Sequence, residues 1–100
     1  MVKHIIVWTL NDGYSVSEKE NILKEIKEGL EGLKGKVPGI VEIKVEINPL
    51  ESSNTDLMLD STFENEDALK GYAIHPDHVE VATKKVRPFT KIRSCFDYEV

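Results

Sequence analysis

Tyr72, His75 and His78 lie within one seven-residue stretch and are the side chains best suited to acid–base chemistry. A histidine that titrates near neutral pH can remove a proton, and a tyrosine hydroxyl can donate a hydrogen bond. On a straight helix, Tyr72 and His78 would lie about 240° apart, too far to face one cavity. Pro76 breaks the helix between them, because the residue before a proline avoids the helical region. The break therefore allows these two side chains to converge on one cavity.

The same residues also have structural interpretations. The ring of His75 is expected to cap the helix that begins at Pro76, and Tyr72 can simply bury its ring and hydrogen-bond its hydroxyl. His75 and His78 could ligate a transition metal only with help from elsewhere, because no helical His-x-x-x-His or His-x-x-Glu unit is present. The sequence therefore predicts neither a metal site nor a bound cofactor.

The composition describes one ordinary globular domain spanning residues 1–100, with 40% hydrophobic and 31% charged residues. A formal net charge of −5 argues against a general nucleic-acid binder and against binding to anionic membranes. The single cysteine, Cys95, excludes an internal disulfide and a metal site built from several cysteines. The apolar run from Ile5 to Trp8 is too short for a signal peptide or a membrane helix, so we expect a cytoplasmic protein.

Hydrophobic periodicity and turn signals predict the elements that position these residues. Ser17 and Glu20 match a capping box and predict the start of the first helix. Charged residues spaced four apart on this helix, such as Lys27 and Glu31, predict that its outer surface is solvated. Strands are expected at 40–47 and 57–63 and near both ends of the chain, at 3–10 and 92–100, with further helices at 66–72 and 76–86. The order β-α-β-β-α-β predicts an α+β, ferredoxin-like protomer: a four-stranded antiparallel sheet with helices on one face.

Both faces of the first strand are largely apolar. Side chains alternate along a strand, so His4, Ile6 and Trp8 share one face, while Ile5 and Val7 share the other. Helices cover only one face of such a sheet, and we expect the uncovered face to carry Trp8 and isoleucine. A monomer should not expose such a patch, so we predict a homodimer that packs sheet against sheet.

Four segments carry a family resemblance: Lys3-His4-Ile5-Ile6-Val7, Val37-Pro38-Gly39-Ile40, His75-Pro76-Asp77-His78-Val79 and Phe96-Asp97-Tyr98-Glu99. Together they resemble the stress-responsive dimeric α/β-barrel family over nearly the whole chain. The resemblance implies a ferredoxin-like protomer whose sheet joins that of a second copy to form a barrel. One branch of the family is similar to polyketide cyclases, which close a linear chain by aldol condensation.

The resemblance to that branch also implies roles for individual residues. Tyr72 and His78 match an acid–base pair, and His4 matches a histidine that lines the same pocket. Arg93 and Cys95 alternate on one face of the last strand, which by resemblance looks toward the cavity. A buried Arg93 would need an acidic partner such as Asp97, Asp60 or a ligand carboxylate. The remaining residues expected to contact a ligand are Ile6, Trp8, Leu59 and His75.

These observations favour a cytoplasmic homodimer that binds a small organic molecule in a cavity beside the sheet. One alternative is a cyclase, isomerase or lyase that uses His78 as base and Tyr72 as hydrogen-bond donor. A second alternative is a structural or interaction module whose interior is filled by its own side chains. A void of several hundred Å³ near His78 would favour ligand binding or the enzyme over the structural module.

Overall fold

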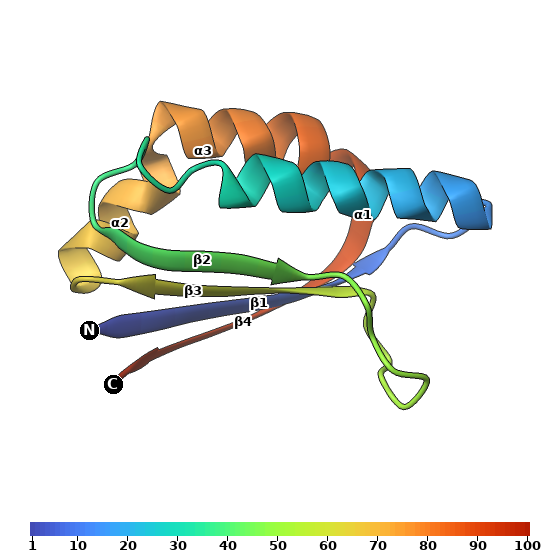
Figure 1. The fold of residues 1–100 in the computed structure, drawn as a ribbon, viewed down its shortest axis with the longest axis horizontal. Helices are drawn as coiled ribbons and strands as arrows, with labels where there is room; N and C mark the ends of the chain where they lie inside the picture. Colours follow the sequence, from blue (N-terminus) through green and yellow to red (C-terminus); the bar gives the residue numbers. More distant parts are fainter.

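The computed structural model describes residues 1–100, which form one four-stranded sheet covered by helices on one face (Figure 1). The strands lie in the order β2-β3-β1-β4, and every neighbouring pair is antiparallel. The predicted β-α-β-β-α-β order is therefore confirmed. None of the helices has the length and apolar composition needed to cross a bilayer. The elements are β1 (Val2–Leu10), α1 (Val16–Glu31), β2 (Ile40–Glu46), β3 (Leu57–Phe63), α2 (Glu66–Ile74), α3 (Pro76–Val81), a π-helical turn (Ala82–Val86), a 3-10 turn (Arg87–Phe89) and β4 (Thr90–Glu99).

The first helix begins two residues earlier than predicted, because Ser15 and not Ser17 is its N-cap. The backbone N–H of Glu18 donates to the Ser15 hydroxyl at 3.2 Å, and the backbone N–H of Ser15 donates to the Glu18 carboxylate at 2.9 Å. The segment contains two overlapping capping-box patterns, one starting at Ser15 and one at Ser17. Ser15 has the extended backbone that an N-cap requires, so the earlier pattern forms the cap.

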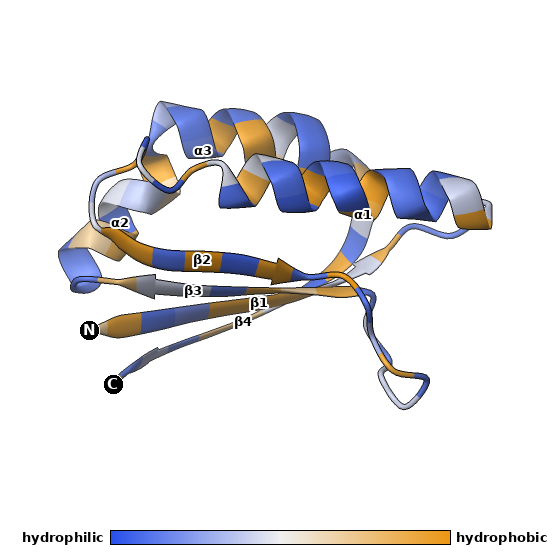
Figure 2. Ribbon diagram, viewed as in Figure 1, coloured by the Kyte–Doolittle hydropathy of each residue, from blue (hydrophilic) through white to orange (hydrophobic).

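The hydrophobic core lies between the sheet and the helices, and Trp8 belongs to it. Trp8 is only 5% exposed and clusters with Ile6 of β1 and with Leu30 of α1. Hydrophobic and hydrophilic segments alternate along α1 and along the strands, as expected for elements with one buried face (Figure 2). The prediction that Trp8 lies on the uncovered face is wrong, because alternation shows which residues share a face without showing which face the helices cover.

The uncovered outer face of the sheet carries a different apolar patch. Phe96 of β4 lies directly opposite Ile5 of β1 in the strand register, and Ile92 lies opposite Thr9. Phe96 is 67% exposed, and its ring lies 5.6 Å from that of Tyr98. Residues directly opposite each other in a sheet point to the same side. The outer patch therefore consists of Ile5, Val7, Met58, Ile92, Phe96 and Tyr98.

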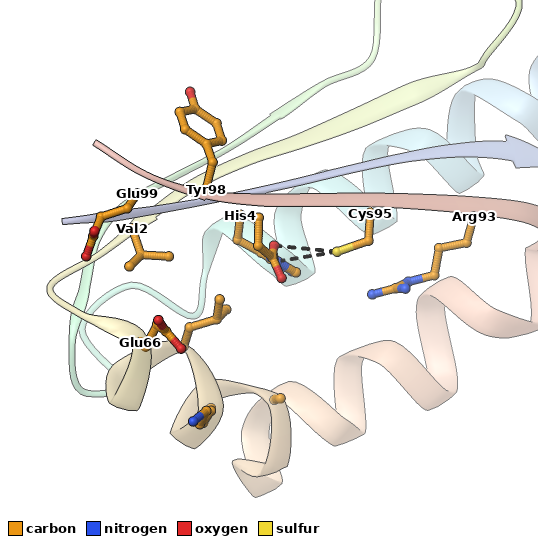
Figure 3. A pocket seen from close by; sticks show the side chains of 11 residues that line it. Val2, His4, Glu66, Arg93, Cys95, Tyr98 and Glu99 are labelled. Carbon is orange, nitrogen blue, oxygen red and sulfur yellow. Dashed lines mark hydrogen bonds and ion pairs between the residues drawn. The ribbon is translucent and has the colours of Figure 1, made fainter.

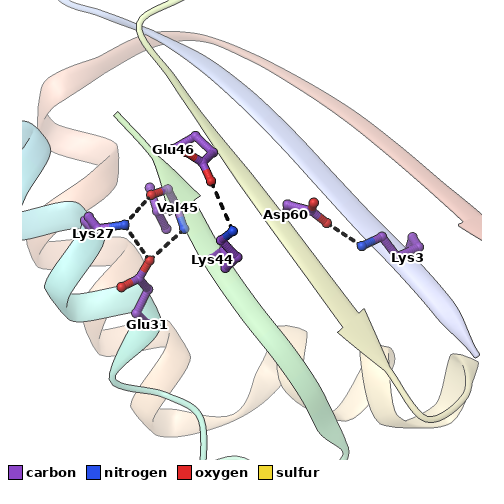
Figure 4. Close-up of polar contacts among 7 residues, drawn as sticks. All are labelled: Lys3, Lys27, Glu31, Lys44, Val45, Glu46 and Asp60. Atoms are coloured by element: carbon purple, nitrogen blue, oxygen red, sulfur yellow. Dashed lines mark hydrogen bonds and ion pairs between the residues drawn. The ribbon is translucent and has the colours of Figure 1, made fainter. Parts of the chain in front are cut away.

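The charged side of α1 is not simply solvated, because it binds the edge of the sheet (Figure 4). Lys27 and Glu31 pair at 2.8 Å, as their spacing predicts. However, the Lys27 ammonium also donates to the Val45 carbonyl at 2.7 Å, and the Glu31 carboxylate accepts from the Val45 N–H at 2.9 Å. Burial disfavours the Glu31 charge, but the bonds from Lys27 and Val45 outweigh it and lower the Glu31 pKa. This pair therefore holds α1 to β2, an edge strand with unpaired backbone groups.

The break before Pro76 separates α2 from α3. His75 ends α2 and is the N-cap of α3, with extended backbone angles of φ −65° and ψ 133°. Its ring nitrogen Nδ1 accepts a hydrogen bond from the Asp77 N–H at 3.1 Å, which confirms the predicted capping role. The helix expected at 76–86 is α-helical only to Val81. The chain then continues through a wider π-helical turn and a tighter 3-10 turn before Thr90. Pro88 lies in the 3-10 turn. A proline is disfavoured in the interior of an α-helix, so the α-helix cannot continue through this position.

Candidate functional site

A cavity of about 440 Å³ lies between the inner face of the sheet and the helices. Most of its wall is hydrophobic, and its polar groups come from the strands and from both sides of the Pro76 break. This composition is typical of small-molecule sites, which combine apolar walls with a few placed polar groups. Seven of the residues predicted to form a site line this cavity: His4, Ile6, Trp8, Leu59, Tyr72, His78 and Arg93.

The two other predicted site residues lie elsewhere. Cys95 lines an adjoining hollow of about 590 Å³, which shares His4 and Arg93 with the cavity (Figure 3). His75 lies in a separate hollow beside the start of α2, and its ring is engaged in capping α3. The structure therefore places Cys95 next to the cavity and His75 outside it.

The rings of Tyr72 and His78 are 4.1 Å apart between centroids and are inclined at 32°. Tyr72 extends from α2 and His78 from α3, and the extended backbone of His75 changes the chain direction between them. Phe63 also packs against Tyr72, with its ring 4.9 Å away. The break at Pro76 thus brings together two side chains that a continuous helix would hold apart.

The Tyr72 hydroxyl is buried without a hydrogen-bond partner. Tyr72 is only 1% exposed, and no donor or acceptor lies within reach of its oxygen. Burial strongly raises the pKa of this phenol, so it stays protonated at neutral pH. An unpaired buried hydroxyl costs about 1–3 kcal/mol, and an acceptor entering the cavity would recover that energy. The hydroxyl is therefore a hydrogen-bond donor that no other group of the protein engages.

His78 is half-buried and neutral. Burial lowers its pKa, and the nearby charges of His4, Arg87 and Arg93 act in the same direction, while a hydrogen bond to the Ala73 carbonyl opposes them. That bond joins Nδ1 of His78 to the Ala73 oxygen at 3.3 Å. A carbonyl oxygen can only accept, so the proton is assigned to Nδ1. The other ring nitrogen, Nε2, then carries a lone pair that can accept a proton.

Next to the cavity, His4 meets two residues of β4. Nδ1 of His4 lies 2.5 Å from Oδ1 of Asp97, and the Cys95 sulfur lies 3.5 Å from the same oxygen and 4.0 Å from the same nitrogen. The pairing of β1 with β4 explains this contact, because His4 and Asp97 are directly opposite in the register. Burial raises the pKa of the Cys95 thiol, and Asp97 adds to the shift.

Arg93 is exposed and pairs with neither Asp97 nor Asp60, so a ligand carboxylate is the one expected acidic partner that remains for it. Asp97 is engaged by His4, and Asp60 lies on the outer face, where it pairs with Lys3 at 2.6 Å (Figure 4). Alternation along β4 places Arg93, Cys95 and Asp97 on one face, so sequence reasoning could have placed Asp97 beside the cavity. Its partner could not be found that way, because His4 is 93 residues away. The free guanidinium of Arg93 remains able to meet an anionic group of a ligand.

The chain is similar to a known protein family and to several solved structures. The family described as Stress Responsive A/B Barrel Domain matches residues 2–100. A dimeric protein of unknown function and ferredoxin-like fold from Bacteroides fragilis is 36% identical, with a TM-score of 0.91 over 99% of this chain and 95% of that chain. Comparison with curated proteins gives no match.

More distant solved structures share the fold. A protein from Arabidopsis thaliana is 24% identical, with a TM-score of 0.76 over 100% of this chain and 95% of that chain. A hydroxynitrile lyase from Passiflora edulis is 17% identical, with a TM-score of 0.72 over 97% of this chain and 90% of that chain. At these identities the similarity extends to the fold and no further.

Proposed function

The chain belongs to the stress-responsive A/B barrel domain family, and on that basis we propose that it is a homodimer that binds a small organic molecule beside Tyr72 and His78. Relatives from Bacteroides fragilis and Thermobifida fusca are described as dimeric proteins of unknown function. The proposal therefore rests mainly on two features of this chain, the outer patch of the sheet and the cavity on its inner face.

The outer patch supports the homodimer. Phe96, Ile92 and Tyr98 are exposed on β4, next to half-buried Ile5 and Val7 of β1. Apolar clusters of this kind on a sheet face mark an interaction surface, and a second copy of the same chain offers a matching surface across a twofold axis. The cavity lies on the opposite face of the sheet, so this dimer would leave it accessible.

The lining of the cavity defines the chemistry of the ligand. Ile6, Trp8 and Leu59 offer an apolar wall that suits an aromatic or aliphatic body. The Tyr72 hydroxyl can donate a hydrogen bond to an oxygen acceptor such as a carbonyl, and the unpaired guanidinium of Arg93 can bind a carboxylate. We infer a small carbonyl compound with an acidic group. A cavity of about 440 Å³ also argues against a module filled by its own side chains.

The observation that carries this proposal is the buried, unpartnered hydroxyl of Tyr72. 4-Acetylbenzoate is a suitable probe, because it combines an aromatic ring, a ketone and a carboxylate. Trp8 is the only tryptophan and lines the cavity, so binding should change the intrinsic fluorescence, and calorimetry should give the affinity. Tyr72→Phe removes only the hydroxyl and should weaken binding about tenfold, the value of roughly one buried hydrogen bond.

The matched control is Tyr14→Phe, which removes a hydroxyl from a tyrosine outside the cavity. It should bind the probe like the wild type. Equal affinity of Tyr72→Phe and Tyr14→Phe would show that the hydroxyl does not contact the ligand. Absence of any fluorescence or calorimetric signal with 4-acetylbenzoate and with its neutral analogue acetophenone would argue against the inferred ligand class.

A second candidate function is proton transfer next to a carbonyl, and the 4.1 Å ring separation of Tyr72 and His78 favours it. Nε2 of His78 would take a proton from the carbon beside the carbonyl. The C–H electron pair would form the double bond of an enolate, and the negative charge would move to the oxygen. The Tyr72 hydroxyl would stabilise that oxygen by donating a hydrogen bond. A neutral His78 and a protonated Tyr72 are the states that this step requires.

Exchange of the acetyl protons of 4-acetylbenzoate in D₂O tests this step by proton NMR. The wild type should accelerate the exchange, and His78→Gln should reduce the acceleration about 10²–10⁴-fold while the probe still binds. Asp77→Asn changes a neighbouring residue outside the cavity and should leave the rate unchanged. Binding without any accelerated exchange would leave ligand binding as the function and refute proton transfer for this ligand class.

A further inference from the structure

Three different ligand atoms converge on the inner face of the sheet where β1 pairs with β4. They are Nδ1 of His4, Sγ of Cys95 and Oδ1 of Asp97, and all three lie within 4.8 Å of one another. Figure 3 shows His4 and Cys95 projecting from the strands toward the helices, whereas Tyr98 points to the other side. Imidazole, thiolate and carboxylate are the three side-chain ligands that zinc sites use.

The arrangement differs from a catalytic relay. In a Cys–His–Asp relay, the thiol and the carboxylate contact opposite nitrogens of the imidazole ring. Here the Cys95 sulfur and the Asp97 oxygen both approach Nδ1 of His4, at 4.0 and 2.5 Å. The three donor atoms therefore surround one point instead of forming a chain, which is the geometry of ligands around an ion.

We propose that His4, Cys95 and Asp97 form a binding site for a divalent transition metal ion of the zinc type. Around a tetrahedral Zn²⁺, ligand atoms at about 2.0–2.3 Å from the metal lie about 3.3–3.6 Å from one another. The Cys95–Asp97 separation of 3.5 Å already meets this value. Coordination requires the His4–Asp97 contact of 2.5 Å to open and the His4–Cys95 separation of 4.0 Å to shorten, each by less than about 1 Å.

The surroundings suit such an ion. His4 is almost fully buried, and its ring packs edge-on against Phe63 and Tyr72, each 6.2 Å away, so its orientation is set by the core. Cys95 and Asp97 come from an exposed edge strand, which can adjust by small rotations of the side chains. The carboxylate and a thiolate, which would release its proton to solvent, neutralise the two charges of the ion.

The hollow of about 590 Å³ beside the three ligands leaves the fourth coordination position open to water or to a ligand. Glu66 and Glu99 also line this hollow and, with Asp97, outnumber the two basic residues, Lys70 and Arg93. Three protein ligands with one open position are typical of zinc sites that bind exogenous molecules. The three ligand side chains lie on the helix-covered side of the sheet, opposite the side to which Tyr98 points.

Cobalt spectroscopy tests the proposal on the full-length protein without a histidine tag. After removal of metals and in the presence of a non-thiol reductant, Co²⁺ should bind one ion per chain. It should produce a thiolate-to-cobalt charge-transfer band and the intense visible bands of a tetrahedral ion. Zn²⁺ should displace it and abolish both. Cys95 is the only cysteine, so the charge-transfer band can come from no other residue.

Single substitutions then separate a built site from casual binding by a thiol. Cys95→Ser should abolish the charge-transfer band, and His4→Gln and Asp97→Asn should each weaken Co²⁺ at least about tenfold. Asp77→Asn, a carboxylate outside the site, should change nothing. Asp97 is on an exposed edge strand, so its variant stays informative even if His4→Gln fails to fold. A wild type without the band, or an affinity that Asp97→Asn leaves unchanged, would overturn the proposal.

Discussion

Truncating Phe96 should dissociate the homodimer, because this ring is the largest exposed apolar group of the outer patch. A phenylalanine side chain can bury about 150–250 Å², and Phe96 is 67% exposed in the protomer. Without the ring, each protomer buries roughly 100 Å² less apolar surface in a sheet-to-sheet contact. This loss reduces the free energy of association by about 2–3 kcal/mol per protomer. Because the twofold axis repeats the change, Phe96→Ala should cost about 4–6 kcal/mol per dimer, or about 10³–10⁴-fold in Kd.

Sedimentation velocity over a range of concentrations measures this effect directly. The wild type should remain dimeric at micromolar concentration, whereas Phe96→Ala should sediment as a folded monomer with unchanged circular dichroism. Ile74→Ala is the matched control, because Ile74 is 80% exposed but lies on α2, away from the outer patch. A monomeric wild type, or equal dimer affinity in Phe96→Ala and Ile74→Ala, would refute the assignment of this face as the interface.

Two further predictions concern the stability of the protomer and can be checked by urea unfolding. The lowered pKa of Glu31 means that its charge stabilises the fold above its unfolded pKa and that this contribution disappears as the pH falls through the lower, folded pKa. Glu31→Gln should therefore lose about 1 kcal/mol at neutral pH, after allowance for the partial exposure of the Glu31–Lys27 bond. The difference from the wild type should shrink as acid protonates Glu31 in the folded protein. Gly39→Ala should cost about 2–4 kcal/mol, because Gly39 has a φ of +86° and a Cβ there would lie 2.5 Å from that of Ala68. Gly35→Ala, with a φ of +87° and no atom within 4 Å, should cost only the conformational part, and an equal loss in both variants would refute the steric explanation.

Much of the candidate site was predictable because local signals position it. The break at Pro76 depends on neighbouring residues alone. It showed that Tyr72 and His78 could converge, and in the structure their rings are in contact. The capping role of His75 follows from the same short segment. The cap of α1 was misplaced for a local reason as well, since two overlapping patterns compete and only the backbone angles distinguish Ser15 from Ser17.

The partners of charged side chains could not be predicted in this way. Sequence spacing correctly paired Lys27 with Glu31 but could not show that both also bind Val45 on another element. Sequence spacing also suggested Asp97 as a partner of Arg93, whereas in the structure Asp97 pairs with His4. Each of these contacts depends on how two segments dock, and docking is decided by the packing of the whole core.

By itself, the sequence determined the order of the elements and which side chains share a face, because both follow from periodicity within a few residues. It could not decide that the Trp8 face is the one the helices cover, since both faces of β1 are apolar and only the packing of α1 and α2 distinguishes them. It also could not bring His4 to Cys95 and Asp97. That cluster exists because β1 and β4, at opposite ends of the chain, pair in a register that places His4 directly across from Asp97.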